Sequence, residues 1–288
     1  MKNLIPTALL LGLLGAGPAL AEDPSSALEL ELNSISGLDF TDGDASFDLQ
    51  SAEASFEIFD FTLTAGIRDF SWTNARTLGF ANGAPEPWEQ LKTVSLRRTF
   101  NRPIRDRLFW TTSLGAGLSF EEESDDSYFA DVVTAFVWSR TADWSFLFGV
   151  GYAWHSEVEL EFELFPAIGF TYRGRAEEGF SASLGIPETG MRYRFSPRSA
   201  LSLGVNPNTF VSRLADDSAV SAAGYAEFIQ FDLGFFYEHR FADRFELRVG
   251  PTLGLEGELK IHDSQGVLLS TEDLESAPGA SLQLKATF

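Results

Sequence analysis

The sequence predicts an all-β fold, a closed antiparallel up-and-down transmembrane β-barrel of 12–14 strands. Three observations predict it. Long stretches alternate between apolar and polar side chains, as expected of strands with one lipid face and one lumen face. Aromatic residues are abundant, with 27 Phe, 6 Trp and 6 Tyr in 288 residues. The chain also begins with the pattern of a secretory signal, which indicates export.

Residues 1–21 are predicted to be a signal peptide. Lys2 precedes a Leu-rich segment at residues 9–14, and Ala19-Leu20-Ala21 forms a small-residue cleavage site, so we expect cleavage after Ala21. Residues 22–288 are then expected to form a single β-barrel domain, and a position partly outside the barrel stays open for residues 22–45. The chain has no Cys, so the exported fold cannot rely on disulfides and has to close through its own backbone hydrogen bonds.

The composition excludes some classes of protein. The chain has 42 Asp and Glu against 21 Lys and Arg, a net charge of −21 at pH 7, which argues against nucleic acid as a partner. Beyond the signal, charges or glycines interrupt every apolar run before it reaches the roughly 20 residues of a membrane helix. The strands must therefore carry any membrane-spanning segment.

Residues 108–120, 146–155, 229–238 and 245–256 alternate most clearly. Backbone groups in lipid have to pair within the protein, so a spanning sheet must close on itself. The count is 14 candidate strands, from residues 28–32 to the last strand at residue 288. Two of them, residues 180–186 and 191–195, are short for a spanning strand. A count of 12 is therefore as open as 14, and odd numbers are excluded for an ordinary bacterial barrel.

The connections between these strands are of two kinds. Short turns rich in Arg, at residues 101–107, 140–143, 173–175, 196–199 and 242–244, alternate with acidic loops at residues 121–126, 216–217 and 263–275. Alternation of the two kinds along the chain is what an up-and-down barrel requires, because successive turns lie at opposite ends. We therefore expect one basic and one acidic end.

The last strand, Ser281-Leu282-Gln283-Leu284-Lys285-Ala286-Thr287-Phe288, resembles the C-terminal strand of Gram-negative outer-membrane β-barrels. The resemblance implies that Leu282, Leu284 and Phe288 belong to the signal read by the barrel-assembly machinery, although Ala286 stands where that family usually has a larger hydrophobic residue. It also implies an outer-membrane location, a periplasmic C-terminus, basic turns inside and acidic loops outside. The implied partners are outer-membrane lipid, lipopolysaccharide and the assembly machinery.

Residues 180–187 and 191–197 resemble the core of a group of Gram-negative outer-membrane β-barrel proteins of unknown function. The size and layout of the chain are more loosely similar to those of hydrocarbon-uptake channels of the phenol-degradation type. Neither resemblance implies a cofactor or a catalytic residue.

Several charged side chains fall on the lumen-facing parity of their predicted strands. They are Glu159, Glu161, Glu163, Arg192, Arg194, Asp232, Glu246, Arg248 and Glu256. A polar channel that selects solutes by charge would need such a lining. A narrow barrel with paired charges and a filled lumen would need it too. The two alternatives are thus a passive channel or uptake pore for a small solute, and a closed-lumen barrel with a structural or surface-interaction role through its acidic loops.

Small inward residues should decide between these alternatives. Inward Gly and Ser residues would either leave a continuous bore or make room for Phe165, Phe228 and Phe236 pointing inward. An enzyme is not expected, because the nearest nucleophile and base, Ser156 and His155, are adjacent and would face opposite sides of a strand. No metal site is expected either, and the acidic segment at residues 39–44 is interpreted as a turn.

Overall fold

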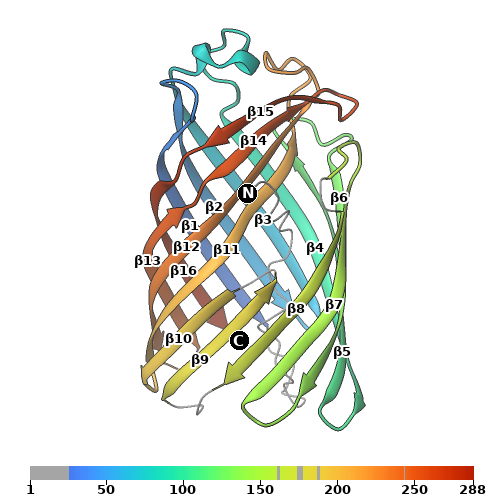
Figure 1. Cartoon of the computed structure of the whole chain (residues 1–288), viewed down its shortest axis with the longest axis vertical. Coiled ribbons are helices and arrows are strands. Elements are labelled where there is room, and N and C mark those ends of the chain that lie inside the picture. Colours follow the sequence, from blue (N-terminus) through green and yellow to red (C-terminus); the bar gives the residue numbers. More distant parts are fainter. Residues whose placement is uncertain (1–25, 161–162, 174–177, 187–188, 243) are drawn as a thin grey trace.

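The computed structural model of the protein describes residues 26–160, 163–173, 178–186, 189–242 and 244–288. Fourteen strands form a tall cylindrical wall (Figure 1). They are β1 (Ala27–Asp39), β2 (Ser46–Ile58), β3 (Phe61–Thr73), β4 (Gln90–Arg105), β5 (Leu108–Phe120), β6 (Tyr128–Ser139), β7 (Trp144–His155), β8 (Leu164–Arg173), β9 (Gly179–Ile186), β10 (Thr189–Ser196), β11 (Ser199–Arg213), β12 (Tyr225–Phe241), β13 (Phe245–Gly254) and β16 (Ala277–Thr287). The predicted signal peptide lies outside the described residues.

Consecutive strands pair antiparallel from β1 to β13, β13 pairs with β16, and β16 pairs with β1. The closing ladder runs from Ala27 opposite Thr287 to Ile35 opposite Gly279. The predicted fold class is therefore confirmed, with 14 strands in the wall. The two short predicted strands are real, and they form the β9–β10 hairpin of eight residues each. Residues 27–39, within the segment whose place was open, form the first wall strand.

The last hairpin of the chain is long and broken in the middle. The 17-residue strand β12 pairs with β13 along its inner part and with β14 (Gly257–His262) along its outer part. Strand β14 pairs in turn with β15 (Leu268–Leu274), which precedes β16. Strands β13 and β14 lie end to end along β12. The β14–β15 part of the hairpin therefore extends beyond the wall at the acidic end.

The wall is interrupted beside the short β9–β10 hairpin. The ladder between β8 and β9 stops at Ile168, so residues 164–167 pair only with β7 within the part of the chain that the structure describes. The ladder between β10 and β11 stops at Val205, so residues 206–212 pair only with β12 among the described residues. Among the described residues these two strand edges have no further partner strand, and we call this interruption of the ladder the wall gap. Side chains fill it, because Leu160 and Phe165 pack in one cluster with Val211.

The outer end of β11 crosses toward β5 rather than continuing up the wall. Arg213 forms a parallel bridge with Phe120, and the Glu121 N–H donates to the Arg213 carbonyl at 2.8 Å. The Ser119 and Ser212 hydroxyls lie 2.5 Å apart in a buried contact. The outer end of β11 therefore lies against the outer end of β5.

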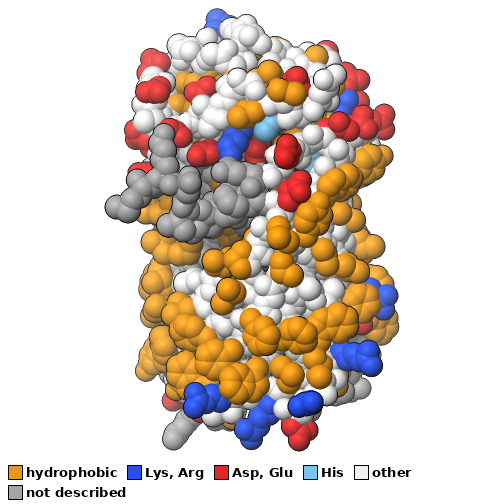
Figure 2. Space-filling model, turned by 45° about the vertical axis from the view of Figure 1, so that its right-hand side comes forward, with side chains coloured by type: hydrophobic (Ala, Val, Ile, Leu, Met, Phe, Trp, Pro, Cys, Tyr) orange, Lys and Arg blue, Asp and Glu red, His pale blue; other side chains and the backbone are white. Residues whose placement is uncertain are grey.

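The outward face of the strands is apolar. Leu63, Phe148, Tyr193 and Leu284 are among the many large hydrophobic residues that remain exposed on the wall. Figure 2 shows hydrophobic side chains as a broad band across the face of the barrel in view. A continuous apolar band of this kind matches the hydrocarbon core of a bilayer, where charged side chains are costly. Among the described residues, no helix is long and apolar enough to cross a membrane.

Charge is separated between the two ends of the barrel. Arg side chains gather at one end, where the turns after β4 and β6 lie, and acidic side chains gather at the other end, around the loops after β5 and β11 (Figure 2). The predicted separation of basic turns from acidic loops is confirmed. We call the basic end the inner end and the acidic end the outer end. The side of the membrane that each end faces stays a prediction.

Candidate functional site in the barrel interior

Strand alternation places a group of charged side chains inside the inner half of the barrel. Arg192 forms an ion pair with Glu238 across β10, β11 and β12, and its guanidinium lies 3.5 Å from the Glu246 carboxylate. Arg194 lines the same small recess. The Arg248 guanidinium lies 3.7 Å from the centroid of the Phe236 ring, in a cation–π contact. These sequence-predicted residues do meet inside the barrel.

Solvent reaches the charged side chains of the inner half. The exposed fraction is 33% for the Arg192 side chain and 34% for Glu246, and on the neighbouring strands β1 and β16 it is 31% for Glu29 and 44% for Lys285. The charges themselves point inward, because Leu28, Leu30, Leu282 and Leu284 occupy the outward positions of the same strands. The inner half of the lumen is therefore wet and lined by charges of both signs.

Asp232 lies further up the interior of β12. The Asn208 amide donates to one of its carboxylate oxygens at 3.2 Å, while the other oxygen is buried without a hydrogen-bond partner among the described residues. Its inward position is as predicted.

The acidic residues after β7 are placed differently from the prediction. The ladder ends at His155, so residues 156–160 do not form a strand. Glu159 is exposed, whereas Val158 and Leu160 are buried in the interior, which reverses the expected sides. Glu163 precedes β8 and is half-buried, and Glu161 lies outside the described residues. Glu256 is exposed at the break between β13 and β14, so it is not part of a regular lumen face.

An apolar cluster fills the outer mouth. It comprises Phe40, Phe47, Phe70, Trp72, Phe80, Trp88, Phe210 and Phe228, and we call it the outer aromatic cluster. The rings of Phe47 and Trp72 are 4.9 Å apart, and those of Trp72 and Trp88 are 5.0 Å apart and nearly perpendicular. The Trp72 indole N–H donates to the Trp88 carbonyl at 2.7 Å. The short helices η1 (Ala75–Thr77) and η2 (Gly79–Ala81) carry Phe80 into this cluster.

Aromatic rings occupy the space beside two inward glycines, so these glycines do not leave a straight bore. A Cβ at Gly151 would overlap the Phe165 ring, and one at Gly234 would overlap the Phe236 ring. Phe165, Phe228 and Phe236 are all buried and point inward, as one of the two alternatives required. The interior is thus filled by rings near the outer end and open to solvent near the inner end.

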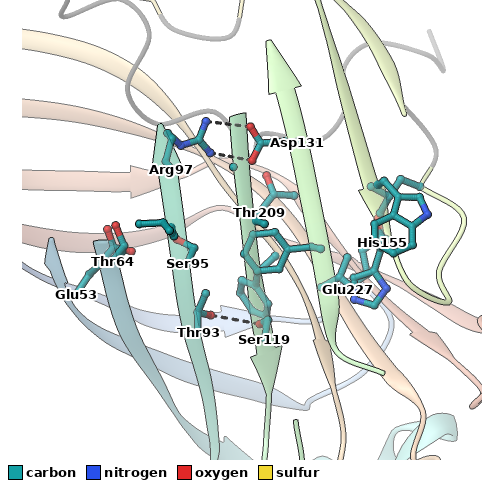
Figure 3. Close-up of a pocket in the computed structure, with 18 of the residues that line it drawn as sticks. Glu53, Thr64, Thr93, Ser95, Arg97, Ser119, Asp131, His155, Thr209 and Glu227 are labelled. Atoms are coloured by element: carbon teal, nitrogen blue, oxygen red, sulfur yellow. Dashed lines mark hydrogen bonds and ion pairs between the residues drawn. The ribbon is translucent and has the colours of Figure 1, made fainter. Parts of the chain in front are cut away.

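A cavity of about 140 Å³ lies between these two zones, beside the wall gap. Its lining includes Thr209, Phe210 and Val211 from the unpaired edge of β11, and Leu160 from the segment before β8. The opposite side is polar and comes from β2 to β6 (Figure 3). The cavity therefore has one apolar and one polar wall.

Arg97 and Asp131 form a bidentate ion pair in the polar wall, with both N–O distances at 2.9 Å (Figure 3). Arg68 donates to the Thr93 hydroxyl at 3.1 Å, and its guanidinium lies 4.6 Å from the centroid of the Phe210 ring. Glu53 lies on the neighbouring strand, diagonal to Arg68, because Ser51 is opposite Arg68 in the ladder. Sequence analysis did not select these four charged residues, although their inward parity on β2, β3, β4 and β6 was available as a signal.

His155 closes one side of the cavity. Its Nδ1 accepts hydrogen bonds from the backbone N–H groups of Val158 at 3.3 Å and Glu157 at 3.4 Å. The proton of the neutral ring is therefore on Nε2, which is buried without a partner among the described residues. Ser156 faces away and donates to the Asp126 carbonyl at 2.6 Å, so the two residues do not pair as nucleophile and base.

The predicted assembly-signal residues lie on the outside of β16. Leu282 and Leu284 are exposed on its apolar face, and the Phe288 side chain is exposed beyond its end. The Phe288 N–H donates to the Ser26 carbonyl at 2.8 Å. This arrangement leaves the three side chains accessible, and their reading by an assembly machinery stays a prediction.

No protein-family model matches the chain, and no curated protein matches its sequence. Among solved structures, an outer-membrane channel from Pseudomonas putida F1 is 8% identical, with 95% of this chain and 100% of that chain covered and a TM-score of 0.44. The NanC porin is 10% identical, with coverage of 90% and 98% and a TM-score of 0.41. The KdgM porin in complex with disordered oligogalacturonate is 6% identical, with coverage of 91% and 99% and a TM-score of 0.38.

Proposed function

We propose that this protein is a passive outer-membrane channel, or uptake pore, for a small solute. The observation that carries the proposal is the solvent-exposed, charged inner half of the lumen. The side chains of Arg192 and Glu246 are 33% and 34% exposed there, and those of Glu29 and Lys285 are 31% and 44% exposed. Ionised side chains that solvent reaches inside a barrel are the lining that a polar solute pathway uses.

The outer aromatic cluster packs the outer end of the interior, so we place the start of the proposed pathway elsewhere. The cavity adjoins the wall gap between β8 and β11, and it lies between the outer surface and the wet inner half. A solute entering beside residues 206–212 would meet the cavity first and the Arg192 group afterwards. The proposed location includes export with cleavage after Ala21 and assembly through Leu282, Leu284 and Phe288.

Single-channel recording of the refolded protein in a planar bilayer tests this proposal. Discrete openings are expected, and Arg192→Gln with Arg194→Gln should shift the selectivity toward cations because two positive charges leave the lumen. Arg98→Gln is the matched control, since Arg98 lies on the outer face over the rings of Phe61 and Phe100. A folded barrel without conductance would contradict the channel.

A closed-lumen barrel is the second candidate function. The outer aromatic cluster and the rings that occupy the glycine positions favour it, because both fill part of the interior. Its function would reside in the acidic outer loops, which could bind lipopolysaccharide phosphates through divalent cations. Absence of conductance together with calcium-dependent binding of lipopolysaccharide to the folded barrel would support this candidate over the channel.

A further inference from the structure

A groove lies on the outward face of the wall near the inner end, where β4, β5 and β6 are neighbouring strands. It measures about 390 Å³, and its lining comprises Arg102, Pro103, Ile104, Trp110 and Phe136. Sites for small molecules typically measure roughly 300–1,000 Å³. The groove is therefore large enough to hold part of a lipid molecule.

The ladders place this groove on the lipid-facing side of the barrel. Arg102 is opposite Trp110, and Trp110 is opposite Phe136, so these three side chains share one face of the sheet. Phe136 is exposed on the apolar wall, and so is Leu114, which has the same parity as Trp110. The groove is therefore separate from the lumen and from the cavity beside the wall gap.

The depth of the groove in the membrane follows from the length of β4. The ladder between β3 and β4 ends at Arg98, which is opposite Phe61. Residues 100–105 therefore have only β5 as a neighbouring strand within the part of the chain that the structure describes. Unpaired backbone groups are not tolerated in the hydrocarbon core. This end of β4 accordingly lies at the level of the lipid headgroups, and Lys and Arg side chains line the inner rim of the apolar band in Figure 2.

The apolar floor of the groove is held in place by its neighbours. The Trp110 indole N–H donates to the Thr134 hydroxyl at 2.8 Å, and that hydroxyl lies 2.8 Å from the Thr112 hydroxyl. The Phe136 ring stacks on the Phe148 ring with centroids 5.5 Å apart. Because these groups already have partners, the rings can receive an acyl chain without rearrangement, which lowers the cost of binding.

Arg102 gives the groove a positive charge at the headgroup level. Its side chain is exposed and forms no hydrogen bond or ion pair with any described residue. Arg98 lies on the same face, about 13 Å away along the strand, and its guanidinium is 4.7 Å and 4.4 Å from the ring centroids of Phe61 and Phe100. An Arg guanidinium binds a phosphate through two parallel hydrogen bonds. A phosphate at the groove would thus give Arg102 the partner that the described residues do not supply.

The surrounding turns do not cancel this charge. Residues 58–62, 98–108 and 138–145 form three neighbouring turns with their strand ends, and they contain five Arg and three Asp, a net charge of +2. These residues are Arg98, Arg102, Arg105, Arg107 and Arg140, and Asp60, Asp106 and Asp143. A headgroup with a net negative charge complements this excess. A zwitterionic headgroup brings an ammonium group that gains nothing from it.

We propose that the groove binds one diacyl phospholipid with an anionic headgroup. Arg102 donates to the phosphate, while Ile104, Trp110 and Phe136 contact the adjoining part of an acyl chain. The bound lipid holds the protruding end of the β4–β5 hairpin at the level of the headgroups. The inference concerns the outside of the barrel, so it stands whether or not the lumen conducts a solute.

Native mass spectrometry of the refolded protein, released from micelles, tests this site. The probes are phosphatidylglycerol and phosphatidylethanolamine with identical acyl chains, and hexa-acylated lipid A, each titrated separately. Lipid A tests the alternative that any lipid phosphate binds. The wild-type protein is expected to retain one phosphatidylglycerol more tightly than either other lipid, by about fivefold or more, the equivalent of roughly 1 kcal/mol for one Arg near an anionic lipid surface.

The headgroup contact is tested at Arg102. Arg102→Gln should weaken phosphatidylglycerol binding about fivefold on the same basis and leave phosphatidylethanolamine binding unchanged. Arg102→Lys keeps the charge but not the planar pair of donors, so its affinity should lie between the two. Arg244→Gln is the matched control, because Arg244 is exposed in the turn between β12 and β13, strands that are not neighbours of β4. It removes the same charge from the inner end and should leave the affinity unchanged.

The acyl-chain contact is tested at Ile104, whose side chain is exposed, so that its replacement leaves the packing of the wall intact. Ile104→Gln should weaken the binding of both phospholipids to the same degree, because their chains are identical. Heat-modifiable mobility confirms that each variant is folded before its lipid binding is compared.

Equal retention of the two phospholipids by the wild-type protein, or tighter retention of lipid A, would overturn the proposed lipid class. Equal losses in Arg102→Gln and Arg244→Gln would show that the basic end attracts anionic lipid diffusely, without a site. A loss in Arg102→Gln with none in Ile104→Gln would exclude the groove as the place where the chain lies.

Discussion

At the scale of single residues, the interior is organised by ion pairs whose partners lie on different strands. The Asp131 carboxylate is 1% exposed and fits into the space left by Gly115, where a Cβ would overlap it. Arg97 reaches it with both terminal nitrogens. Removing one member of such a pair leaves the other charge buried, which costs more than losing both.

We therefore expect Asp131→Ala to lower the free energy of unfolding by about 3–5 kcal/mol. The double variant Arg97→Met with Asp131→Leu should recover most of that loss, because no charge then remains unpaired. Thermal unfolding of the refolded barrels in micelles, followed by heat-modifiable mobility, measures both. A double variant as unstable as the single one would contradict the account.

Glu121, in the acidic loop after β5, gives a prediction of pH dependence. Burial raises the pKa of its carboxyl, the hydrogen bond from the Ala215 N–H partly offsets that rise, and the charges of Glu122, Asp217 and Glu123 add to it. A carboxyl with a raised folded-state pKa favours folding when protonated and opposes it when ionised.

Glu121→Gln should accordingly be more stable than the wild-type protein at pH 7. The difference should vanish as the pH falls below the ordinary Glu pKa of about 4.3, where both side chains are uncharged. Unfolding midpoints between pH 4 and pH 8 test this, with Glu86→Gln, an exposed loop residue, as control. Lower stability of Glu121→Gln at pH 7 would refute the assignment.

At the scale of elements, side chains alternate between the two faces of a strand. This period of two residues made much of the interior predictable. Arg192, Asp232 and Arg248 point inward as their parity required, because each lies in an unbroken ladder. The parity failed after His155, where the ladder ends and Val158 and Leu160 turn inward instead of Glu159. The cavity was not predictable, since Arg68 and Phe210 approach each other across the lumen and their register gives no signal of that contact.

Inward glycines on one strand make room for aromatic rings on a neighbouring strand, as Gly151 does for Phe165. Gly151→Ala should destabilise the barrel by about 1–3 kcal/mol, because the new methyl group overlaps the Phe165 ring and forces it to move. Gly66→Ala is the control, since the nearest atoms to its Cβ would be 3.7 Å away, an ordinary contact. Equal unfolding midpoints for the two variants would contradict the close packing of Phe165.

At the scale of the whole molecule, the separation of charge fixes an expected orientation. Acidic loops at one end and Arg-rich turns at the other predict that the acidic end faces the outside of the cell. The chain has no Cys, so single cysteines report on this without further changes. A membrane-impermeant maleimide added to intact cells should label Glu122→Cys and spare Asp106→Cys until the cells are lysed. The opposite labelling pattern would reverse the orientation.

The contact between the two ends of the chain bears on whether the same strands could be connected in a different order along the sequence. Strand β1 pairs with β16, and the Phe288 N–H is bonded to the Ser26 carbonyl. The order of strands around the cylinder therefore does not depend on where the polypeptide is cut. A circular permutant that joins residue 288 to residue 26 by a short linker, with new ends in the loop at residues 214–224, should close into the same wall. In this permutant Phe288 is no longer the terminal residue. Folding in micelles without assembly in cells would then show that the terminal Phe288 is needed for recognition and not for folding.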